Sequence, residues 1–274
     1  METSLASTPH RPSPYVIAVC HQKGGVAKTT SVSALASILA GEKNPTLVID
    51  LDPTANLTAS FGMNPAKIRR SAADILLGND SLASVCLHTR IPGLDVIPSN
   101  ADMNTVSRFL YLRQRYEYLL QSHLTQEDLS AYKFVLIDCP PAVVSLTVTA
   151  LTAANLAMIP IQCEYYSLQA LDTMFRTIGA VRAKTNPTVG YRLLVTMFDA
   201  RGSLHGRVLE MIRERYGNAL FETMIGFDSK LRESQLAGIP ITIYAPKSRA
   251  TQQYQLLARE LYAYVEKQIV PQET

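Results

Sequence analysis

The chain has 274 residues, of which 47% are hydrophobic and 18% are charged, and its formal net charge is +3. This balance is typical of a globular protein with a substantial core and excludes a disordered chain. The mildly basic charge suits a weakly bound anionic partner but does not require one. The four cysteines, Cys20, Cys86, Cys139 and Cys163, form no CxxC pair, which argues against a metal site or an iron–sulfur cluster and favours a reducing cytoplasm.

The two ends of the chain differ in composition from the rest. Residues 1–14 are rich in Ser, Thr and Pro without an apolar stretch, so we expect a flexible tail and no signal peptide. Residues 15–270 are expected to form a single domain, and residues 271–274 a short C-terminal tail. No segment has the length of a transmembrane helix, which predicts a soluble, cytoplasmic protein.

Short apolar runs alternate with longer helical patterns along almost the whole domain. The runs predict strands at Tyr15–Cys20, Thr46–Asp50, Leu94–Pro98, Phe134–Asp138, Leu156–Pro160 and Leu193–Met197. The helical patterns lie at Thr29–Ala40, Asp102–Leu124, Ser145–Ala154, Leu168–Lys184 and Ser203–Tyr216. Because the apolar runs lack polar alternation, their strands should be covered on both faces. We therefore expect an α/β fold, in which a mostly parallel twisted sheet of seven or eight strands is flanked by helices on both faces.

A final helix is predicted at about Thr251–Ile269. Its apolar residues, Leu257, Leu261, Tyr264 and Val265, form one stripe, and the opposite side carries mixed charges. This pattern favours a helix that packs on the core, because a membrane-surface helix would need a strongly basic polar face.

A glycine-containing segment connects the first predicted strand to the first helix. Glycines let the backbone curl so that successive N–H groups point at one phosphate, and the helix N-terminus adds a partial positive charge. Lys28 would reach the β- and γ-phosphate oxygens, and the Thr29 hydroxyl would bind Mg²⁺. The segment therefore predicts a nucleotide-binding loop formed by Lys23, Gly24, Gly25, Val26, Ala27, Lys28, Thr29 and Thr30.

Acidic residues close two of the predicted strands. Asp50 and Asp52 fall on one side of the chain at the carboxyl end of the second strand. Asp50 either helps to order the Mg²⁺ shell or caps the turn that leads to Asn56. Asp138 closes the strand at Phe134–Asp138, and an acid in that place opposite a phosphate-binding loop is expected to hold Mg²⁺ through a water molecule.

The loop departs from the common P-loop pattern at Gln22 and Ala27, where glycine is usual, and it carries the additional Lys23. This deviant Walker A pattern resembles the ParA/MinD/Soj family of ATPases. Segments farther along the chain are similar to chromosomal Soj-type ParA proteins; they are Asp138–Pro141, 159–168 (IPIQCEYYSL), 195–201 (VTMFDAR) and 244–249 (YAPKSR). The resemblance covers the chain from about Tyr15 to Val265.

The resemblance implies a catalytic site that two subunits share. Lys23 would reach the phosphates of a second subunit, so that ATP closes a homodimer. Lys28 would bind the phosphates of its own chain, and Asp52 would position and activate the attacking water. ATP is the nucleotide that the family uses. Asp228 lies where the family has an Ile-Pro-Arg-Asn turn near the adenine, so the Asp228 carboxylate is expected to accept a hydrogen bond from the adenine amino group.

Two family positions differ in this chain. Pro53-Thr54-Ala55 replaces the usual Pro-Gln-Gly or Pro-Gln-Ala, and Ala27 replaces a glycine. Alanine costs little at position 27 if its φ is negative, as at the start of a helix, whereas a positive φ would weaken phosphate binding. The intact Lys28-Thr29-Thr30 favours the first case.

The resemblance also implies non-specific binding of double-stranded DNA by the ATP-bound dimer. The family's basic positions correspond to Arg201 and Lys230, and Arg232 lies nearby, although each could instead be an ordinary solvated cation. A ParB-like activator or a cargo adaptor would stimulate slow ATP hydrolysis on the nucleoid, with no membrane partner.

Several functions share this chemistry. The chain is interpreted as a DNA-partitioning ATPase, with an ATPase that positions carboxysomes or other cargo as the main alternative. A nucleotide-dependent scaffold with little hydrolysis is a second alternative, against which the retained Asp52 argues. A MinD-like ATPase would need an amphipathic membrane helix that Gln268–Thr274 does not supply, and a nitrogenase-reductase-like carrier would need different cysteine spacing.

Overall fold

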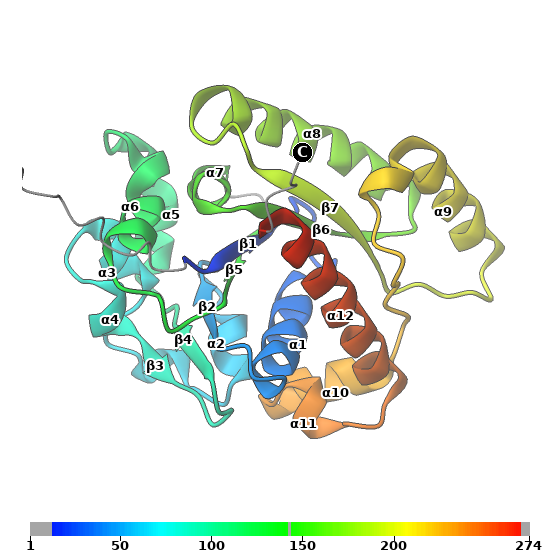
Figure 1. Cartoon of the computed structure of the whole chain (residues 1–274), viewed down its shortest axis with the longest axis horizontal. Coiled ribbons are helices and arrows are strands. Elements are labelled where there is room, and N and C mark those ends of the chain that lie inside the picture. Colours follow the sequence, from blue (N-terminus) through cyan, green and yellow to red (C-terminus); the bar gives the residue numbers. More distant parts are fainter. Residues whose placement is uncertain (1–12, 142–143, 270–274) are drawn as a thin grey trace, which may run out of the picture.

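The structure is a computed structural model that describes residues 13–141 and 144–269. Within these residues, seven strands form one twisted sheet in the order β3-β4-β2-β5-β1-β6-β7 (Figure 1). The strands are β1 (Tyr15–Val19), β2 (Thr46–Asp50), β3 (Leu87–His88), β4 (Leu94–Ile97), β5 (Phe134–Asp138), β6 (Leu156–Gln162) and β7 (Gly190–Thr196). All neighbours are parallel except β3 and β4. The predicted fold is confirmed, although the two-residue strand β3 was not expected.

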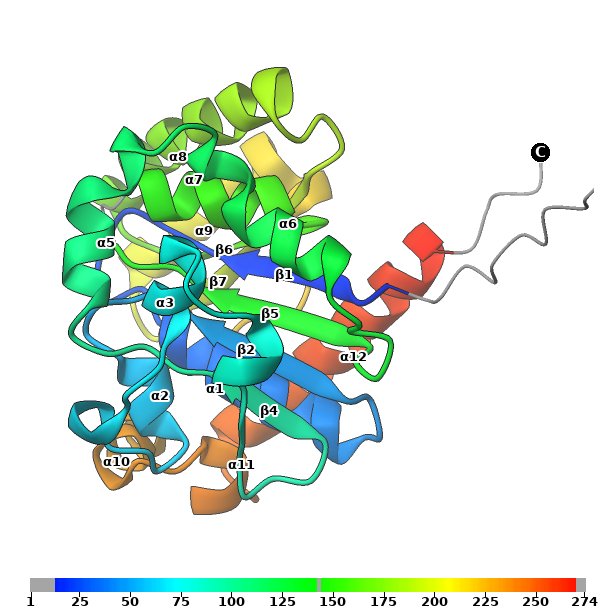
Figure 2. The ribbon, with the colours of Figure 1, turned by 90° about the vertical axis from the view of Figure 1, so that its left-hand side faces the viewer.

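Helices cover both faces of the sheet. They are α1 (Lys28–Gly41), α2 (Asn56–Ser60), α3 (Ala72–Leu77), α4 (Leu82–Val85), α5 (Met103–Phe109), α6 (Leu119–Gln126), α7 (Val144–Ala153), α8 (Tyr165–Lys184), α9 (Ser203–Tyr216), α10 (Ser229–Ala237), α11 (Ile241–Tyr244) and α12 (Arg249–Ile269). Figure 1 and Figure 2 together show α7 and α8 on one face of the sheet and α1 and α12 on the other.

Two hydrophobic cores result from this layering. Ile17 and Val19 of β1 point into the core beneath α1 and α12, whereas Ala18 and Cys20 point into the core beneath α7 and α8. Cys20 and Cys139 are fully buried, as expected for thiols in apolar runs. Because β1 is buried on both faces, its sequence reads as an uninterrupted apolar run.

The predicted continuous helix Asp102–Leu124 is wrong. The segment contains α5, two short 3₁₀ turns and α6, and the break includes Arg115, whose φ of 56° is incompatible with a right-handed helix. Buried leucines lie on both sides of the break, at Leu110 and Leu120, so the apolar spacing imitates one helix.

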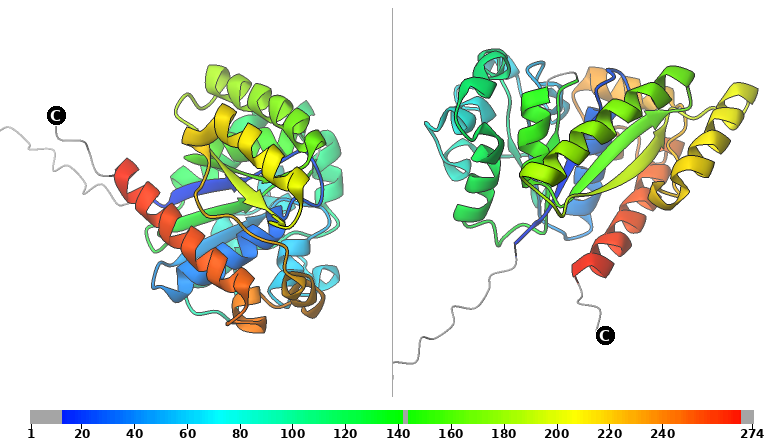
Figure 3. Two further views of the ribbon diagram at one scale, coloured as in Figure 1. Left: turned by 90° about the vertical axis from the view of Figure 1, so that its right-hand side faces the viewer. Right: turned by 90° about the horizontal axis from the view of Figure 1, so that it is seen from above.

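The final helix is confirmed, and α12 begins two residues earlier than expected. Leu257, Leu261 and Val265 are fully buried, while Tyr264 is half-buried. The N-terminal end of β1 and the C-terminal end of α12 lie on the same side of the molecule (Figure 3). Within the described residues, no helix has both the length and the apolar character needed to span a membrane. The predicted tails lie outside these residues, except for positions 13 and 14, so the domain boundaries stay predictions.

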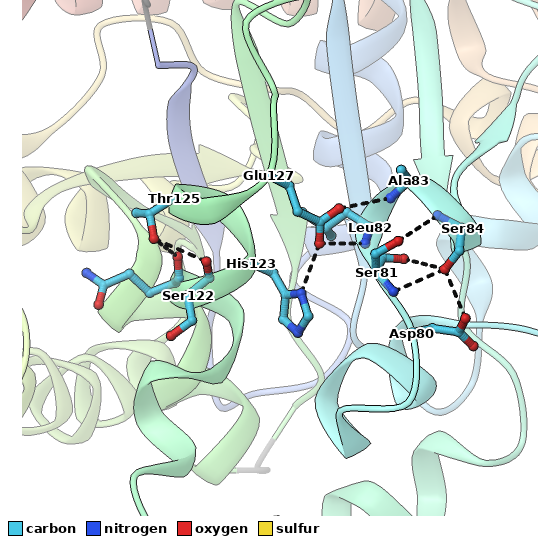
Figure 4. Close-up of polar contacts among 10 residues, drawn as sticks. Asp80, Ser81, Leu82, Ala83, Ser84, Ser122, His123, Thr125 and Glu127 are labelled. Atoms are coloured by element: carbon cyan, nitrogen blue, oxygen red, sulfur yellow. Dashed lines mark hydrogen bonds and ion pairs between the residues drawn. The ribbon is translucent and has the colours of Figure 1, made fainter. Parts of the chain in front are cut away.

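A polar junction joins α4 to α6 (Figure 4). Glu127 accepts hydrogen bonds from the backbone N–H groups of Leu82, at 2.8 Å, and Ala83, at 3.1 Å, and it pairs with His123 Nδ1 at 2.9 Å. Partial burial raises the pKa of Glu127, but these hydrogen bonds outweigh it and lower the pKa. The carboxylate therefore satisfies the first N–H groups of α4.

Candidate nucleotide-binding site

The predicted loop and acids meet at the carboxyl edge of the sheet. Strand register places Asp138 beside Val19 on one side and beside Asp50 on the other. A cavity of about 410 Å³ opens at this edge, and its lining residues are Gly24, Gly25, Ala27, Lys28, Thr29, Thr30, Asp52, Thr54, Asn56, Ala59, Ser60, Pro141, Met197 and Gln235. Most of the predicted loop and Asp52 thus line one cavity, while Lys23, Val26, Asp50 and Asp138 lie outside its lining.

Lys28 and Thr29 begin α1 at the floor of the site. Lys28 is buried, with 6% of its surface exposed, and its Nζ donates to the Lys23 carbonyl oxygen at 3.2 Å. Burial lowers the pKa of Lys28, although the nearby carboxylates of Asp138 and Asp52 act in the opposite direction. The site therefore positions a cation at the cavity wall, where phosphate oxygens would replace the lost hydration.

The residues that would hold Mg²⁺ are in contact. The Thr29 hydroxyl donates to Asp138 Oδ2 at 2.6 Å, and Asp138 Oδ1 is buried without a hydrogen-bond partner. Burial, and then the charge of Asp50, raise the pKa of Asp138, so a cation at the free oxygen would stabilise the ionised form. In the described residues, no group of three or more His, Cys, Asp or Glu side chains is placed to hold a metal ion.

Asp50 holds the start of α2. Its Oδ1 accepts the Asp52 N–H at 3.0 Å, and its Oδ2 accepts both the N–H and the hydroxyl of Thr58, at 2.9 and 2.7 Å. Burial raises its pKa to about 6. These bonds favour the capping alternative, and a place for Asp50 in the metal shell stays a prediction. Asp52 lines the cavity with its Oδ1 fixed by the N–H and hydroxyl of Thr54, at 2.8 and 2.7 Å.

The expectation of a negative φ at Ala27 is wrong. Ala27 has φ 66° and ψ 32°, the left-handed conformation, because it is the residue that precedes α1 and is not part of its first turn. Ala55 precedes α2 in the same conformation, with φ 53°. The family usually has glycine at position 27 and has glycine or alanine at position 55. Glycine adopts the left-handed conformation without a steric cost.

Two bracing residues were not among the predicted site residues. At the end of β6, Gln162 Nε2 donates to the Gly25 carbonyl at 3.0 Å and its Oε1 accepts from Lys23 Nζ at 3.1 Å. At the end of β7, the Thr196 hydroxyl donates to the Val26 carbonyl at 3.1 Å. A polar residue that closes an apolar strand was the available signal, since such residues lie at the ligand-binding edge of a parallel sheet.

Lys23 and His21 shape the loop entrance. Lys23 Nζ turns toward the β6–α8 junction and pairs with Glu164 at 2.5 Å. The Lys23 N–H donates to His21 Nδ1 at 2.9 Å, and His21 is buried with no partner for its Nε2. Burial, and then the charge of Lys28, lower the pKa of His21 to about 4. His21 is therefore neutral at physiological pH, which keeps Nδ1 available as an acceptor.

A smaller cavity of about 80 Å³ adjoins the first. The two share Ala27, Thr30, Met197 and Gln235, and the second is also lined by Thr196, Ile225, Gly226, Phe227, Asp228, Leu231 and Arg232. Asp228 lies there, but its Oδ1 accepts the Lys230 N–H at 3.0 Å and its Oδ2 accepts the Ala250 N–H at 3.1 Å. Contact with a base stays a prediction for Asp228, which has a clear structural role at the start of α10.

The predicted DNA-binding residues divide into two groups. Arg201 lies in the turn after β7 and Lys230 lies in α10, and both are exposed. Arg232 instead places its guanidinium 5.1 Å from the centre of the Phe227 ring, at the smaller cavity. Arg232 is exposed as well and stays a predicted DNA-binding residue, although it also borders the smaller cavity. Arg201 and Lys230, which match the family's basic positions, form the proposed DNA-binding face.

Residues 15–191 match the model of a family described as an AAA domain. The chromosome partitioning protein ParA of Caulobacter vibrioides is 36% identical over 90% of this chain and 93% of its own length. The sporulation initiation inhibitor protein Soj of Bacillus subtilis is 33% identical, covering 90% and 98% of the two chains.

Solved structures agree on the fold. Cobyrinic acid a,c-diamide synthase from Mycobacterium smegmatis, with bound ADP and magnesium, is 30% identical with a TM-score of 0.81, covering 93% of this chain and 96% of the other. An ATP complex of an McdA variant from Cyanothece has the same TM-score at 16% identity, covering 92% and 98%; it shows the fold alone.

Proposed function

We propose that this chain, which belongs to the ParA/Soj family of P-loop ATPases, is a partition ATPase switched by ATP and Mg²⁺. ATP would close a homodimer that holds DNA without sequence preference on the nucleoid, and hydrolysis would release it. The contact between Thr29 and Asp138 beside the Asp52-lined cavity carries the proposal, because it joins the metal-binding and water-positioning groups at one phosphate site.

Each polar group has a distinct part in this mechanism. Lys28 and the loop N–H groups bind the phosphates, while Thr29 and Asp138 would hold Mg²⁺, which neutralises charge on the phosphates when bound. Asp52, fixed by Thr54, orients the attacking water. Phosphoryl transfer depends on such orientation more than on a strong base, so an ionised aspartate suffices.

Lys23 would connect the nucleotide to the second subunit. In the single chain its ammonium group is paired with Glu164 and Gln162, and Lys23 is not among the residues that line the cavity. Reaching a partner's phosphates requires Lys23 to leave these acceptors, so closing the dimer exchanges an exposed ion pair for a phosphate contact.

The decisive test compares two variants in the presence of ATP and Mg²⁺. We expect Asp52→Ala to bind ATP, release no phosphate and accumulate as a dimer in light scattering. Lys28→Ala should bind no nucleotide and stay monomeric. Asp102→Ala, which removes an exposed acid, should behave like the wild type. A strictly monomeric Asp52→Ala chain with bound ATP would contradict the assigned role of Asp52.

DNA binding needs a separate measurement. Arg201→Ala with Lys230→Ala should lose DNA binding while ATP-dependent dimerisation continues, because the side chains that would touch phosphate are lost and the loop is intact. Normal retention of this variant on DNA would remove the proposed face. If ATP turnover depends on cobyrinic acid and does not change with DNA, a cobyrinic acid a,c-diamide synthase activity, as named for the mycobacterial structure, would be favoured instead.

A positioning ATPase for carboxysomes or other cargo, the main alternative from the sequence, is the second candidate, because it would use the same ATP switch on the nucleoid. Stimulation of slow phosphate release by a ParB-like protein would support partition, whereas stimulation by a cargo adaptor would support positioning. A scaffold with little hydrolysis would show neither stimulation nor a loss of phosphate release in Asp52→Ala.

A further inference from the structure

Both cations of the proposed DNA-binding face are paired with a carboxylate of the same chain. Arg201 makes a two-pronged ion pair with Asp199, in which Nε donates to Oδ1 at 3.0 Å and Nη2 donates to Oδ2 at 2.9 Å. Lys230 Nζ donates to Glu233 Oε2 at 2.7 Å, and the Tyr244 hydroxyl donates to the same oxygen at 3.0 Å. Each cation therefore already holds the kind of acceptor that a phosphate would offer.

The backbone places the two ion pairs on neighbouring segments. The Phe198 N–H donates to the Ile225 carbonyl at 3.0 Å, and the Phe227 N–H donates to the Phe198 carbonyl at 3.2 Å. These bonds fix the turn after β7 beside the segment that leads into α10. Arg201 is 88% exposed and Lys230 49% exposed, so a nucleic-acid backbone could reach both cations.

We infer that Asp199 and Glu233 mask Arg201 and Lys230 in the single chain, and that DNA phosphates must displace these carboxylates before the chain binds. The inference rests on the proposed function, since it concerns regulation of the proposed DNA-binding face. Hydrogen bonds from the Arg201 side chain lower the pKa of Asp199 to about 2, so the carboxylate stays ionised at physiological pH. Asp199 therefore competes with phosphate for Arg201 across the physiological pH range.

Masking explains how DNA binding could depend on ATP. A single chain offers two cations that must first leave their carboxylates, which lowers its affinity for DNA. A closed dimer offers both faces to one duplex, so the second contact becomes intramolecular and needs no further encounter. Masked cations therefore confine DNA binding to the dimer, whereas unmasked cations would let the single chain bind.

The test neutralises both carboxylates without shortening them, in the full-length Asp199→Asn, Glu233→Gln chain. Binding to a fluorescein-labelled DNA duplex is followed by anisotropy across a series of KCl concentrations, with and without ATP and Mg²⁺. Because exposed ion pairs are individually weak, we expect binding without nucleotide to tighten about tenfold, within roughly three- to thirtyfold. With ATP and Mg²⁺, binding should tighten by at least the same factor, because a closed dimer carries two neutralised faces.

Two matched variants separate masking from net charge and from misfolding. Asp172→Asn with Glu42→Gln removes the same two charges, one of them from the Arg215–Asp172 ion pair, and should change DNA affinity less than about twofold. Asp199→Glu with Glu233→Asp keeps both charges and should stay closer to wild-type affinity than the neutralised chain. Equal tightening by the Asp172 and Glu42 control would overturn the inference.

The outcomes distinguish the inference from the proposed function. If the wild type binds DNA with ATP but the neutralised variant has the same affinity, masking is refuted and the proposed function stands. If the wild type binds no DNA even with ATP at low salt, the proposed function fails in its DNA step. In that case, binding by the neutralised variant would still support masking, and no binding by either chain would overturn both.

Discussion

Replacing Ala27 with glycine should stabilise the folded chain. A non-glycine residue in the left-handed conformation costs about 1–2 kcal/mol, and Ala27 has φ 66°. Glycine removes that cost but makes the unfolded chain more flexible, which offsets about 0.4–1 kcal/mol. Ala27 is only half-buried, so little packing is lost with its methyl group. The net gain is about 0.8 kcal/mol in the free energy of unfolding, within a range of about 0 to 1.6.

Urea unfolding followed by circular dichroism would measure this change, since the chain has no tryptophan for fluorescence. Ala263→Gly is the matched control, because Ala263 is exposed within α12 and should lose about 1 kcal/mol on the same substitution. The two substitutions thus have opposite expected signs. If Ala27→Gly loses as much stability as Ala263→Gly, the strain assigned to position 27 does not exist.

The same substitution tests where the strain acts. The left-handed conformation at Ala27 is already present in the chain without nucleotide, so its cost falls on folding rather than on binding. We therefore expect the dissociation constant for ATP to change by less than about twofold in Ala27→Gly. A much tighter ATP complex would mean that the loop moves on binding and that strain at Ala27 increases when phosphate arrives.

Three further predictions concern the neighbouring groups. Gln162→Ala should weaken ATP binding about fivefold, because the loop loses one hydrogen bond at Gly25. A titration with a fluorescent ATP analogue measures this change, and an unchanged affinity would contradict the role of Gln162 in holding the loop. The folded pKa of His21, about 4, lies below the unfolded value of about 6.5, so the unfolded state binds a proton first as the pH falls between these values. The free energy of unfolding should therefore fall by up to about 3 kcal/mol over this pH range, and His21→Asn should show a smaller fall in urea unfolding. An identical pH profile for the variant would contradict the burial argument. Because the pKa of Glu127 is lowered in the folded chain, its carboxylate contributes stability above about pH 4.5, and this contribution is lost as the pH falls through the lowered folded pKa. Glu127→Gln should cost about 1 kcal/mol at pH 7, and its difference from the wild type should shrink as the pH falls below about 4.5. A difference that does not change with pH would contradict the charge contribution.

Local chemistry explains what could be predicted from the sequence. The nucleotide-binding loop and Asp52 follow apolar strands, Asp138 closes one, and parallel strands bring their carboxyl ends together at one edge. Contacts between residues distant in the sequence were beyond that argument. Gln162 closes an apolar strand, which indicates the ligand-binding edge, but it lies 137 positions from Gly25 and neither segment alone indicates that the two residues meet. For Asp50, the sequence allowed either a capping role or a place in the Mg²⁺ shell, and only its hydrogen bonds with Thr58 favour capping.

Backbone conformation was the other feature that residue types did not reveal. Arg115 interrupts a segment whose apolar spacing suits one helix, and Ala27 adopts a conformation that its side chain disfavours. In both places the surrounding structure imposes the conformation: leucines on each side of Arg115 reach the core, and the loop must bend before α1 begins. Tertiary packing therefore overrides local preference where a segment connects two anchored elements.

The nucleotide cavities and the proposed DNA-binding face lie on the same two chain segments. Met197 lines both cavities, and Arg201 follows four residues later in the turn after β7. Asp228 lines the smaller cavity, and Lys230 follows two residues later in α10. A nucleotide that contacts Met197 and Asp228 would act on the two segments that carry Arg201 and Lys230. Coupling between ATP and DNA therefore needs no long pathway, because the same short backbone segments border both sites.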